Sequence, residues 1–220
     1  MNFKQAHTSN FKRGRTGNIL YIVEHYTANN GDTAKNNADY FANNGNLSAS
    51  AHYFVDEKGV WQSVKDTDTA YHCGTAGTYK HPKCRNANSI GIEMCSRKDA
   101  NGKYYFKEET IKNAANLTKD LMKKHNIPIE NVIRHYDVTG KICPAPMVTD
   151  ESLWKEFKSM LTSKPKLVSG NDIVWELMNG KHKVEITEVK RAVKALDMAK
   201  NHSEYSSLYW ILYKLVNENR

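Results

Sequence analysis

The sequence has no hydrophobic run long enough to cross a membrane. Its apolar stretches are short, such as Ile19–Val23, whereas a membrane-spanning helix needs about 20 predominantly apolar residues. Residues 1–15 carry positive charge but lack the apolar core of a secretory signal peptide. We therefore expect no membrane insertion, and synthesis in the host cytoplasm without a signal peptide.

Cysteine is scarce and is not arranged in a C-x-x-C pattern. The four cysteines are Cys73, Cys84, Cys95 and Cys143. This number is too small for a disulfide scaffold in 220 residues, and in a reducing compartment a metal or thiol role is favoured over a disulfide. Cys73, Cys84 and Cys95 are predicted to be free, buried thiols.

Nucleic-acid-binding motifs are also missing, although the chain is basic. It has 32 Lys and Arg against 24 Asp and Glu, a net charge of +8. Such a charge attracts polyanions, but the basic residues are scattered. Nothing resembles a helix-turn-helix, a zinc-finger pair or an aromatic RNA-binding strand. No nucleic acid is predicted as a partner.

Alternating strand and helix patterns are present over the first 160 residues. A mixed central β-sheet flanked by helices, an α/β fold, is therefore expected. Strands are predicted at Asn18–Glu24, His52–Asp56, Val60–Val64, Ser89–Met94 and Asn131–His135, and helices at Thr33–Asn43, Lys107–Lys124 and Leu153–Leu161.

The C-terminal part differs in composition and is predicted to be a separate small helical domain. Residues 163–168 are expected to be a linker between a domain over 1–162 and one over 169–220. Two helices are predicted there, at Thr187–Lys200 and Ser203–Asn217. Their aromatic residues either form the core of a small domain, which needs large side chains, or form a binding surface such as a cell-wall-binding module.

Three residues form a candidate metal-binding set. His25 and His135 lie at the carboxyl ends of predicted strands, and Cys143 follows in a loop bounded by Gly140 and Pro144. Two imidazoles and a thiolate suit zinc and leave a fourth tetrahedral position open. The spacing alone is weak evidence, because nine histidines offer many triples and each could simply be a hydrogen-bonded structural residue.

The surrounding segments make this set more specific. IVEHYTAN, SAHYFVDEKG, AYHCG, NSIGIEMC and RHYDVTGKICPAP occur in this order. They resemble the type 2 N-acetylmuramoyl-L-alanine amidases, a family that includes phage lysozymes and the peptidoglycan recognition proteins. The resemblance covers about residues 15–160. It implies a zinc-dependent amidase domain and a phage or prophage endolysin that acts on the cell wall after release.

The resemblance also implies roles for individual residues. His25, His135 and Cys143 would bind one catalytic Zn²⁺, whose activated water cleaves the amide between the lactyl group of N-acetylmuramic acid and L-alanine. Glu93 would transfer the proton of the attacking water. Lys141 would stabilise the oxyanion. The alternatives are a structural carboxylate at Glu93 and a solvated loop lysine at Lys141.

Two features concern the proton-transfer group. Glu24 adjoins His25, but successive side chains of a strand point to opposite faces, so Glu24 is expected to face away from the metal. Some members of the family have a catalytic tyrosine before the histidine of the second segment. The corresponding residue here is Ala51, which shifts the expected burden towards Glu93.

Weaker candidates have equally plausible structural readings. His72 matches a histidine common in the family and either lines the substrate groove or packs in a loop. His52 is predicted to be a core residue. Asp137 either orients an imidazole or is a turn residue.

The expected partner is bacterial peptidoglycan, with anionic wall polymers as a further partner for the positive charge. The alternative function is a peptidoglycan recognition protein without catalysis. Such relatives commonly lack the third ligand, which is present here as Cys143. A regulatory role on another enzyme has no support in the sequence.

Overall fold

A computed structural model describes residues 1–74 and 78–162 of the chain. The predicted linker at 163–168 and the predicted helical domain at 169–220 lie outside the described residues. The domain division therefore stays a prediction.

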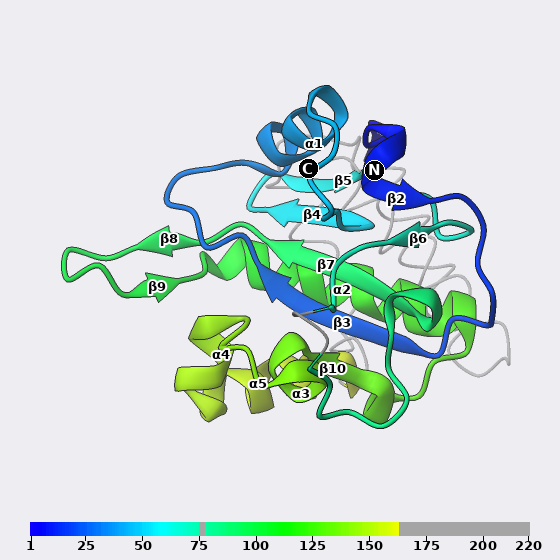
Figure 1. Cartoon of the computed structure of the whole chain (residues 1–220). Helices are drawn as coiled ribbons and strands as arrows, with labels where there is room; N and C mark the ends of the chain where they lie inside the picture. The colour runs from blue at the N-terminus through cyan, green and yellow to red at the C-terminus, as the bar shows by residue number, and fades with distance from the viewer. Residues whose placement is uncertain (75–77, 163–220) are drawn as a thin grey trace, which may run out of the picture. The chain divides into compact units, whose positions relative to one another are not determined.

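The centre of the fold is a mixed six-stranded sheet (Figure 1). In spatial order its strands are β1 (Asn2–Phe3), β5 (Gly59–Gln62), β4 (Tyr53–Asp56), β7 (Ser89–Met94), β3 (Tyr21–Tyr26) and β10 (Val132–Arg134). β4 and β5 are antiparallel, and all other neighbours in this sheet are parallel. The predicted mixed α/β sheet is confirmed.

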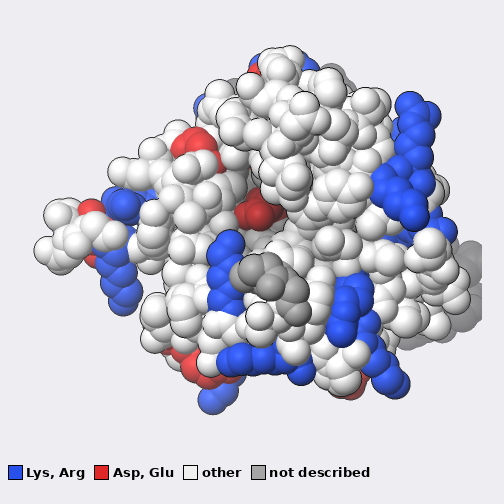
Figure 2. Space-filling view, viewed as in Figure 1, with Lys and Arg blue, Asp and Glu red and all other residues white. Residues whose placement is uncertain are grey.

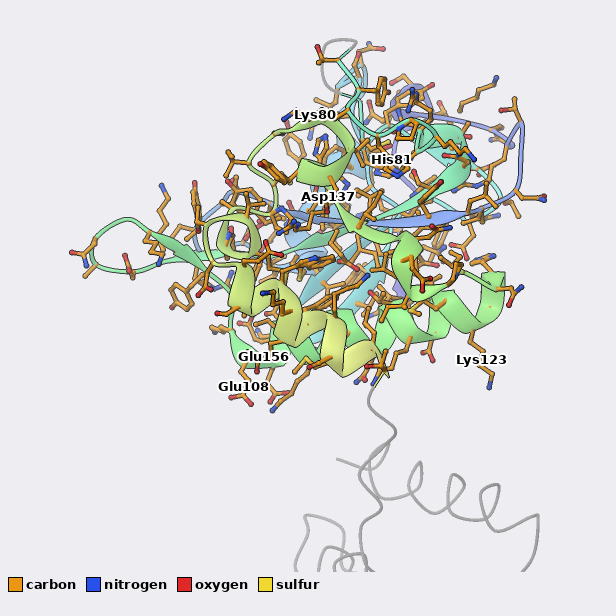
Figure 3. The ribbon with its side chains drawn as sticks, turned by 90° about the horizontal axis from the view of Figure 1, so that it is seen from below. Lys80, His81, Glu108, Lys123, Asp137 and Glu156 are labelled. Atoms are coloured by element: carbon orange, nitrogen blue, oxygen red, sulfur yellow. The ribbon has the colours of Figure 1, made fainter. Side chains whose placement is uncertain are left out.

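One face of the sheet is covered by the helices α2 (Glu108–His125) and α5 (Glu151–Thr162). Apolar side chains at alternate strand positions point towards these helices, because successive side chains of a strand face opposite sides of the sheet. In β7 they are Ile90, Ile92 and Met94, which share a core cluster with Phe157 of α5. The opposite sides of the helices point to solvent, as Glu108, Lys123 and Glu156 show in Figure 3.

The other face of the sheet carries smaller elements. α1 (Ala34–Asn43) packs on β4 and β5, and begins at Thr33, whose hydroxyl accepts the backbone N–H of Asn36. α3 (His135–Thr139) contacts β3 and β10. α4 (Ala145–Thr149), by contrast, packs against α5, and its Met147 belongs to the core cluster of Ile90 and Phe157 on the α2 side. The central strands β3 and β7 thus end between α1 on one side and α3 on the other (Figure 1).

Short elements were not predicted. Besides β1, α3 and α4, they are the 3₁₀ turns η1 (Thr8–Asn10), η2 (Asn86–Asn88) and η3 (Ile129–Asn131), and two small antiparallel pairs, β2 (Phe11–Lys12) with β6 (Thr69–Ala70) and β8 (Arg97–Lys98) with β9 (Tyr104–Tyr105). Within residues 1–74 and 78–162, no helix combines the length and apolarity needed to cross a bilayer.

Candidate metal centre and active site

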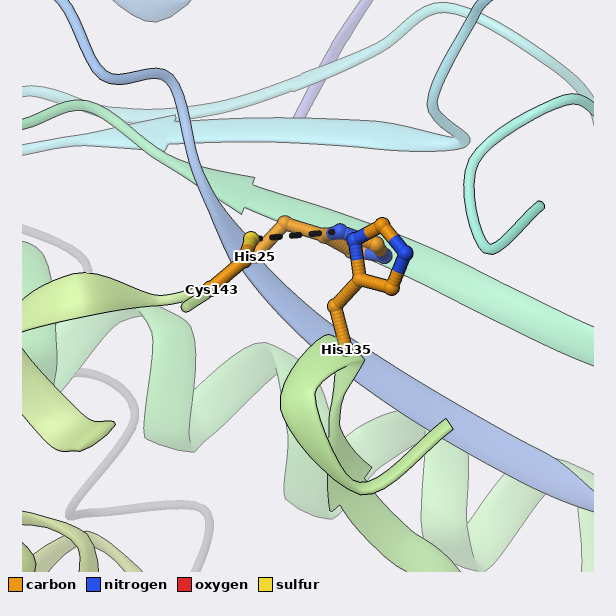
Figure 4. Close-up of side chains that lie close together, drawn as sticks. All are labelled: His25, His135 and Cys143. Atoms are coloured by element: carbon orange, nitrogen blue, oxygen red, sulfur yellow. Dashed lines mark hydrogen bonds between the residues drawn. The ribbon is translucent and has the colours of Figure 1, made fainter. Parts of the chain in front are cut away.

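His25 is the fifth residue of β3 and points away from α2. Alternation along the strand places it on the same face as Tyr21 and Val23. The side chain is buried, with 1% of the residue exposed. Its Nδ1 lies 3.7 Å from Sγ of Cys143 (Figure 4).

The sequence predicts that His135 ends a strand, and this prediction is wrong. β10 stops at Arg134, and His135 is the first residue of α3. The cause is local: the Asp137 carboxylate accepts the Arg134 backbone N–H at 2.8 Å and caps the new helix. The turn brings the His135 ring to within 4.7 Å of the His25 ring, centroid to centroid.

Cys143 comes from the loop after α3. Gly140 ends that helix in the left-handed region, at φ 84°, a conformation that glycine adopts without steric cost. The Cys143 carbonyl accepts the backbone N–H of Tyr136 at 2.8 Å, which folds the loop back over α3. The thiol is buried, with 3% of the residue exposed.

The three side chains have the geometry of a metal site. Ligand atoms of His25, His135 and Cys143 all lie within 4.8 Å of one another. Tetrahedral zinc with ordinary Zn–N and Zn–S bonds would hold a nitrogen and a sulfur about 3.6 Å apart. The observed 3.7 Å between His25 Nδ1 and Cys143 Sγ fits that value. Three protein ligands also leave one coordination position for water or substrate, as in catalytic zinc sites.

The protonation of these groups suits a cation as well. Burial, followed by the nearby His135 and His72, holds the pKa of His25 well below its ordinary value. Burial also lowers the pKa of His135 to about 4, so both imidazoles are neutral donors. Burial raises the pKa of the Cys143 thiol to about 12, and a coordinated metal ion would deprotonate it.

Glu93 lies beside this set. It is the direct partner of His25 in the parallel register of β3 and β7, and paired residues of neighbouring strands share a face. Its Oε2 is buried and has no hydrogen-bond partner among the described residues. Burial raises the pKa of Glu93 to about 8, and the positive charge of Lys141 opposes that rise.

Lys141 is exposed on the loop between α3 and Cys143. Its charge acts on Glu93 and on all three candidate ligands. The space-filling view shows a hollow in this face, with acidic surface at its floor and a basic side chain at its rim (Figure 2). The arrangement can therefore bind a metal cation, with the Glu93 carboxylate to accept a proton and the charge of Lys141 nearby.

Glu24 points to the opposite face, as strand alternation predicts. Its Oε1 accepts a hydrogen bond from Thr118 Oγ1 of α2 at 2.8 Å. The residue is fully buried beneath the helix. Glu24 therefore has no access to the space between His25 and Cys143.

His72 is buried against His25, and its ring is held by hydrogen-bond contacts within the protein. Its Nδ1 lies 3.0 Å from His25 Nε2, and its Nε2 lies 3.1 Å from Ser89 Oγ. Both ring nitrogens are thus engaged within the protein, which leaves neither for a substrate. Ser89 could not be recognised from the sequence as a contact of His72, because only its place at the start of the β7 segment stands out.

The remaining candidates, His52 and Asp137, make contacts that support the fold. His52 is fully buried, and its Nδ1 accepts the backbone N–H of Gly91 at 3.0 Å. Asp137 pairs with Arg134 at 3.0 Å. The cysteines predicted to be free and buried, Cys73, Cys84 and Cys95, are confirmed as such.

Comparison with known proteins agrees with this geometry. Residues 15–146 match the family described as N-acetylmuramoyl-L-alanine amidase, Amidase_2. The chain belongs to this amidase family. The amidase CwlL of Bacillus licheniformis is 40% identical over 152 residues, which are 64% of this chain and 40% of CwlL. The amidase BlyA of Bacillus subtilis is 36% identical over 158 residues, 66% of this chain and 42% of BlyA.

Solved structures show the same fold. The structure of PlyL matches with a TM-score of 0.61 and 30% identity, over 74% of this chain and 97% of PlyL. The catalytic domain of XlyA matches with a TM-score of 0.58 and 30% identity, over 73% of this chain and 99% of that domain. The chain spans about two fifths of the length of the amidases CwlL and BlyA, whereas it covers nearly all of these two solved chains.

Proposed function

We propose that the chain is a zinc-dependent peptidoglycan amidase that cleaves the bond between the lactyl group of N-acetylmuramic acid and L-alanine of the stem peptide. The observation that carries the proposal is the convergence of His25, His135 and Cys143 within 4.8 Å in a chain of the amidase family. Glu93 and Lys141, the proposed catalytic residues, flank that set.

The metal is proposed to be held by His25, His135 and Cys143. When bound, zinc would lower the pKa of a coordinated water to about 7 and polarise the amide carbonyl. An amide needs this help because its carbonyl is a weak electrophile and its amine a poor leaving group.

Glu93 is proposed to move the proton. Its Oε2 is buried, has no hydrogen-bond partner within the part of the chain that the structure describes, and lies on the side of the sheet that carries His25. The carboxylate would accept a proton from the attacking water and pass it to the departing L-alanine nitrogen. A pKa raised towards neutrality by burial suits a group that must both take and release that proton.

Lys141 is proposed to stabilise the negative charge that develops on the carbonyl oxygen. Its ammonium group lies on the exposed loop and acts electrostatically on Glu93 and His135. A positioned cation at this place strengthens its interaction as the oxygen gains charge, and so lowers the barrier rather than only binding the substrate.

Recognition of peptidoglycan without cleavage is the second candidate function. It would need only the hollow and not a complete ligand set. The presence of Cys143, Glu93 and Lys141 together favours catalysis.

Mass spectrometry of soluble products tests the choice. The zinc-loaded protein is incubated with purified Gram-positive walls of several peptide types, beside a Cys143→Ala variant. Stem peptides with free L-alanine amines, and glycans with intact muramic lactyl acids, are expected only from the unaltered protein. Bound zinc and tight wall binding without product from any wall would instead establish the recognition protein.

The place of action is proposed to be the cell wall, reached after release from the cytoplasm, as for an endolysin. The net charge of +8 is proposed to attract the protein to anionic wall polymers. Wall binding should then weaken between low and moderate salt, because screening weakens attraction between exposed charges. A salt-independent binding constant would exclude that contribution.

The segment after residue 162 is proposed to be a separate helical domain that contributes to wall binding. Deletion of residues 166–220 should lower wall binding and leave the melting temperature of the remaining domain nearly unchanged. A lower melting temperature with unchanged binding would show that the segment only stabilises the enzyme.

A further inference from the structure

The structure assigns a positioning role to His72 and Ser89: together they hold His25 in the tautomer that turns a bare Nδ1 towards the metal. This inference rests on the proposed metal site. It concerns the groups behind His25, which make no contact with the substrate in the proposed reaction.

The donor and acceptor of each hydrogen bond can be assigned in turn, starting from the Arg85 carbonyl. The Arg85 carbonyl can only accept, and Ser89 Oγ lies 2.7 Å from it, so the single hydroxyl proton of Ser89 is donated there. Ser89 Oγ must then accept from the group 3.1 Å away, which is Nε2 of His72. His72 therefore carries its proton on Nε2.

The same argument continues to the metal ligand. A neutral imidazole has one N–H, so Nδ1 of His72 is an acceptor. The partner 3.0 Å from it is Nε2 of His25, which must donate. His25 consequently carries its proton on Nε2 and presents a lone pair on Nδ1, the atom 3.7 Å from Cys143 Sγ.

The neutral state that this argument requires is supported by the burial of both rings. Ser89 is fully buried, and His72 is 9% exposed. Solvent therefore offers little competition for these hydrogen bonds.

The surrounding backbone is shaped for His72. A Cβ on Gly91 would lie 2.5 Å from Cγ of the His72 ring, so only glycine lets the ring lie against β7 at this point. The Asn86 side chain accepts the backbone N–H groups of His72 and Cys73, at 3.0 Å and 2.8 Å. His72 is thus held both at its backbone and at its ring.

The remaining contact of Ser89 is compatible with this direction. Cys73 Sγ lies 3.9 Å from Ser89 Oγ. A thiol is a weak donor, and the hydroxyl oxygen has a second lone pair to accept it. The Ser89 hydroxyl therefore still donates its proton to the Arg85 carbonyl.

Ring-nitrogen NMR and metal affinity test the inference. In the metal-free protein labelled with ¹⁵N-histidine, His25 should show a protonated Nε2 and an unprotonated Nδ1. Substitution His72→Phe removes the acceptor, and zinc affinity measured by chelator competition should fall about 10- to 100-fold, as for other groups that orient metal-bound histidines. His72→Gln can accept at Oε1 and donate at Nε2, and should stay within a few-fold of the unaltered protein.

Ser89→Ala is the second variant. It frees His72 to take either tautomer and should weaken zinc binding less than His72→Phe does. Melting temperatures of the metal-free variants control for folding. An unaltered zinc affinity in a folded His72→Phe variant, or a protonated Nδ1 on His25 in the unaltered protein, would overturn the inference. Loss of wall cleavage with the expected tautomer and zinc affinity would overturn only the proposed function.

Discussion

His25 and Glu93 are direct partners across the parallel strands β3 and β7. The candidate ligand and the candidate proton acceptor are thus placed by backbone register, not by a mobile loop. A slip of one residue between these strands would put Ile92 or Met94 opposite His25, because side chains alternate between the two faces. The hydrophobic pattern that buries Ile92 and Met94 under α2 also keeps Glu93 on the face of the site.

Replacing Glu93 with glutamine should leave the metal bound and lower turnover by about 10²- to 10⁴-fold, the usual contribution of general acid–base catalysis. Glu24→Gln is the matched control, since Glu24 lies on the opposite face against Thr118. It should cleave walls at nearly the unaltered rate. Metal content by mass spectrometry and product release are the measurements, and loss of zinc from Glu93→Gln would make Glu93 a structural residue.

Replacing Cys143 with alanine should abolish zinc retention and wall lysis, because only two of the three proposed ligands remain. Cys95→Ala removes a thiol of similar burial outside the candidate set, and should keep both properties. Elemental analysis and turbidity of a wall suspension give the two readouts. Lysis by Cys143→Ala at the unaltered rate would refute the site.

Replacing Lys141 with methionine should lower turnover by about 10²- to 10³-fold, the cost of removing one oxyanion-stabilising donor in other enzymes. Lys80→Met removes a charge close to the same loop, where Lys80 approaches Gly140, and should change turnover little. Steady-state kinetics on a soluble muramyl peptide separates the two variants. Equal effects of both would indicate a general charge effect on substrate attraction.

Removing the metal should destabilise the domain. A ligand that binds only the folded state stabilises it by about 2.7 kcal/mol at a hundredfold excess over its Kd. Chelation should therefore lower the melting temperature, and zinc should restore it. Cys143→Ala should show no such difference, and an unchanged melting temperature of the unaltered protein on chelation would argue against tight metal binding.

Glu57 should make stability depend on acid pH. A hydrogen bond from Lys107, with a further contribution from Arg97, lowers the pKa of Glu57 to about 2. A lowered pKa stabilises the folded state above the ordinary carboxyl pKa, and that contribution is lost as the pH falls towards 2. Because the group is partly exposed, roughly 1 kcal/mol is expected.

Glu57→Gln should therefore be less stable than the unaltered protein at pH 7 and equally stable near pH 2. Denaturant unfolding between these values checks the sign. A difference that widened on acidification would contradict it.

The sequence predicts the long elements well because their patterns are long. The helix expected at Lys107–Lys124 is observed at Glu108–His125, and the strand expected at Ser89–Met94 has those bounds. Strands of two residues, such as β1 and β9, show no period from which they could be predicted.

The residues of the site could be predicted only where they lie in a recognisable sequence motif. His25, His135 and Cys143 were named from the sequence, and the structure brings them together. The helical start at His135 depends on a capping bond from Asp137, which strand propensity does not show. The contact between His72 and Ser89 joins two segments through tertiary packing, so spacing alone could not reveal it.

His25 and Cys143 are separated by 118 positions in the chain. On a ribosome, β3 emerges long before the loop that carries the thiol, and contacts between segments so far apart form late because a long loop must close first. A nascent chain would therefore acquire its complete metal-binding set only when nearly all of the described domain has been synthesised. Fragments that end before Cys143 should therefore lack one of the three proposed ligands and bind zinc more weakly than the complete domain.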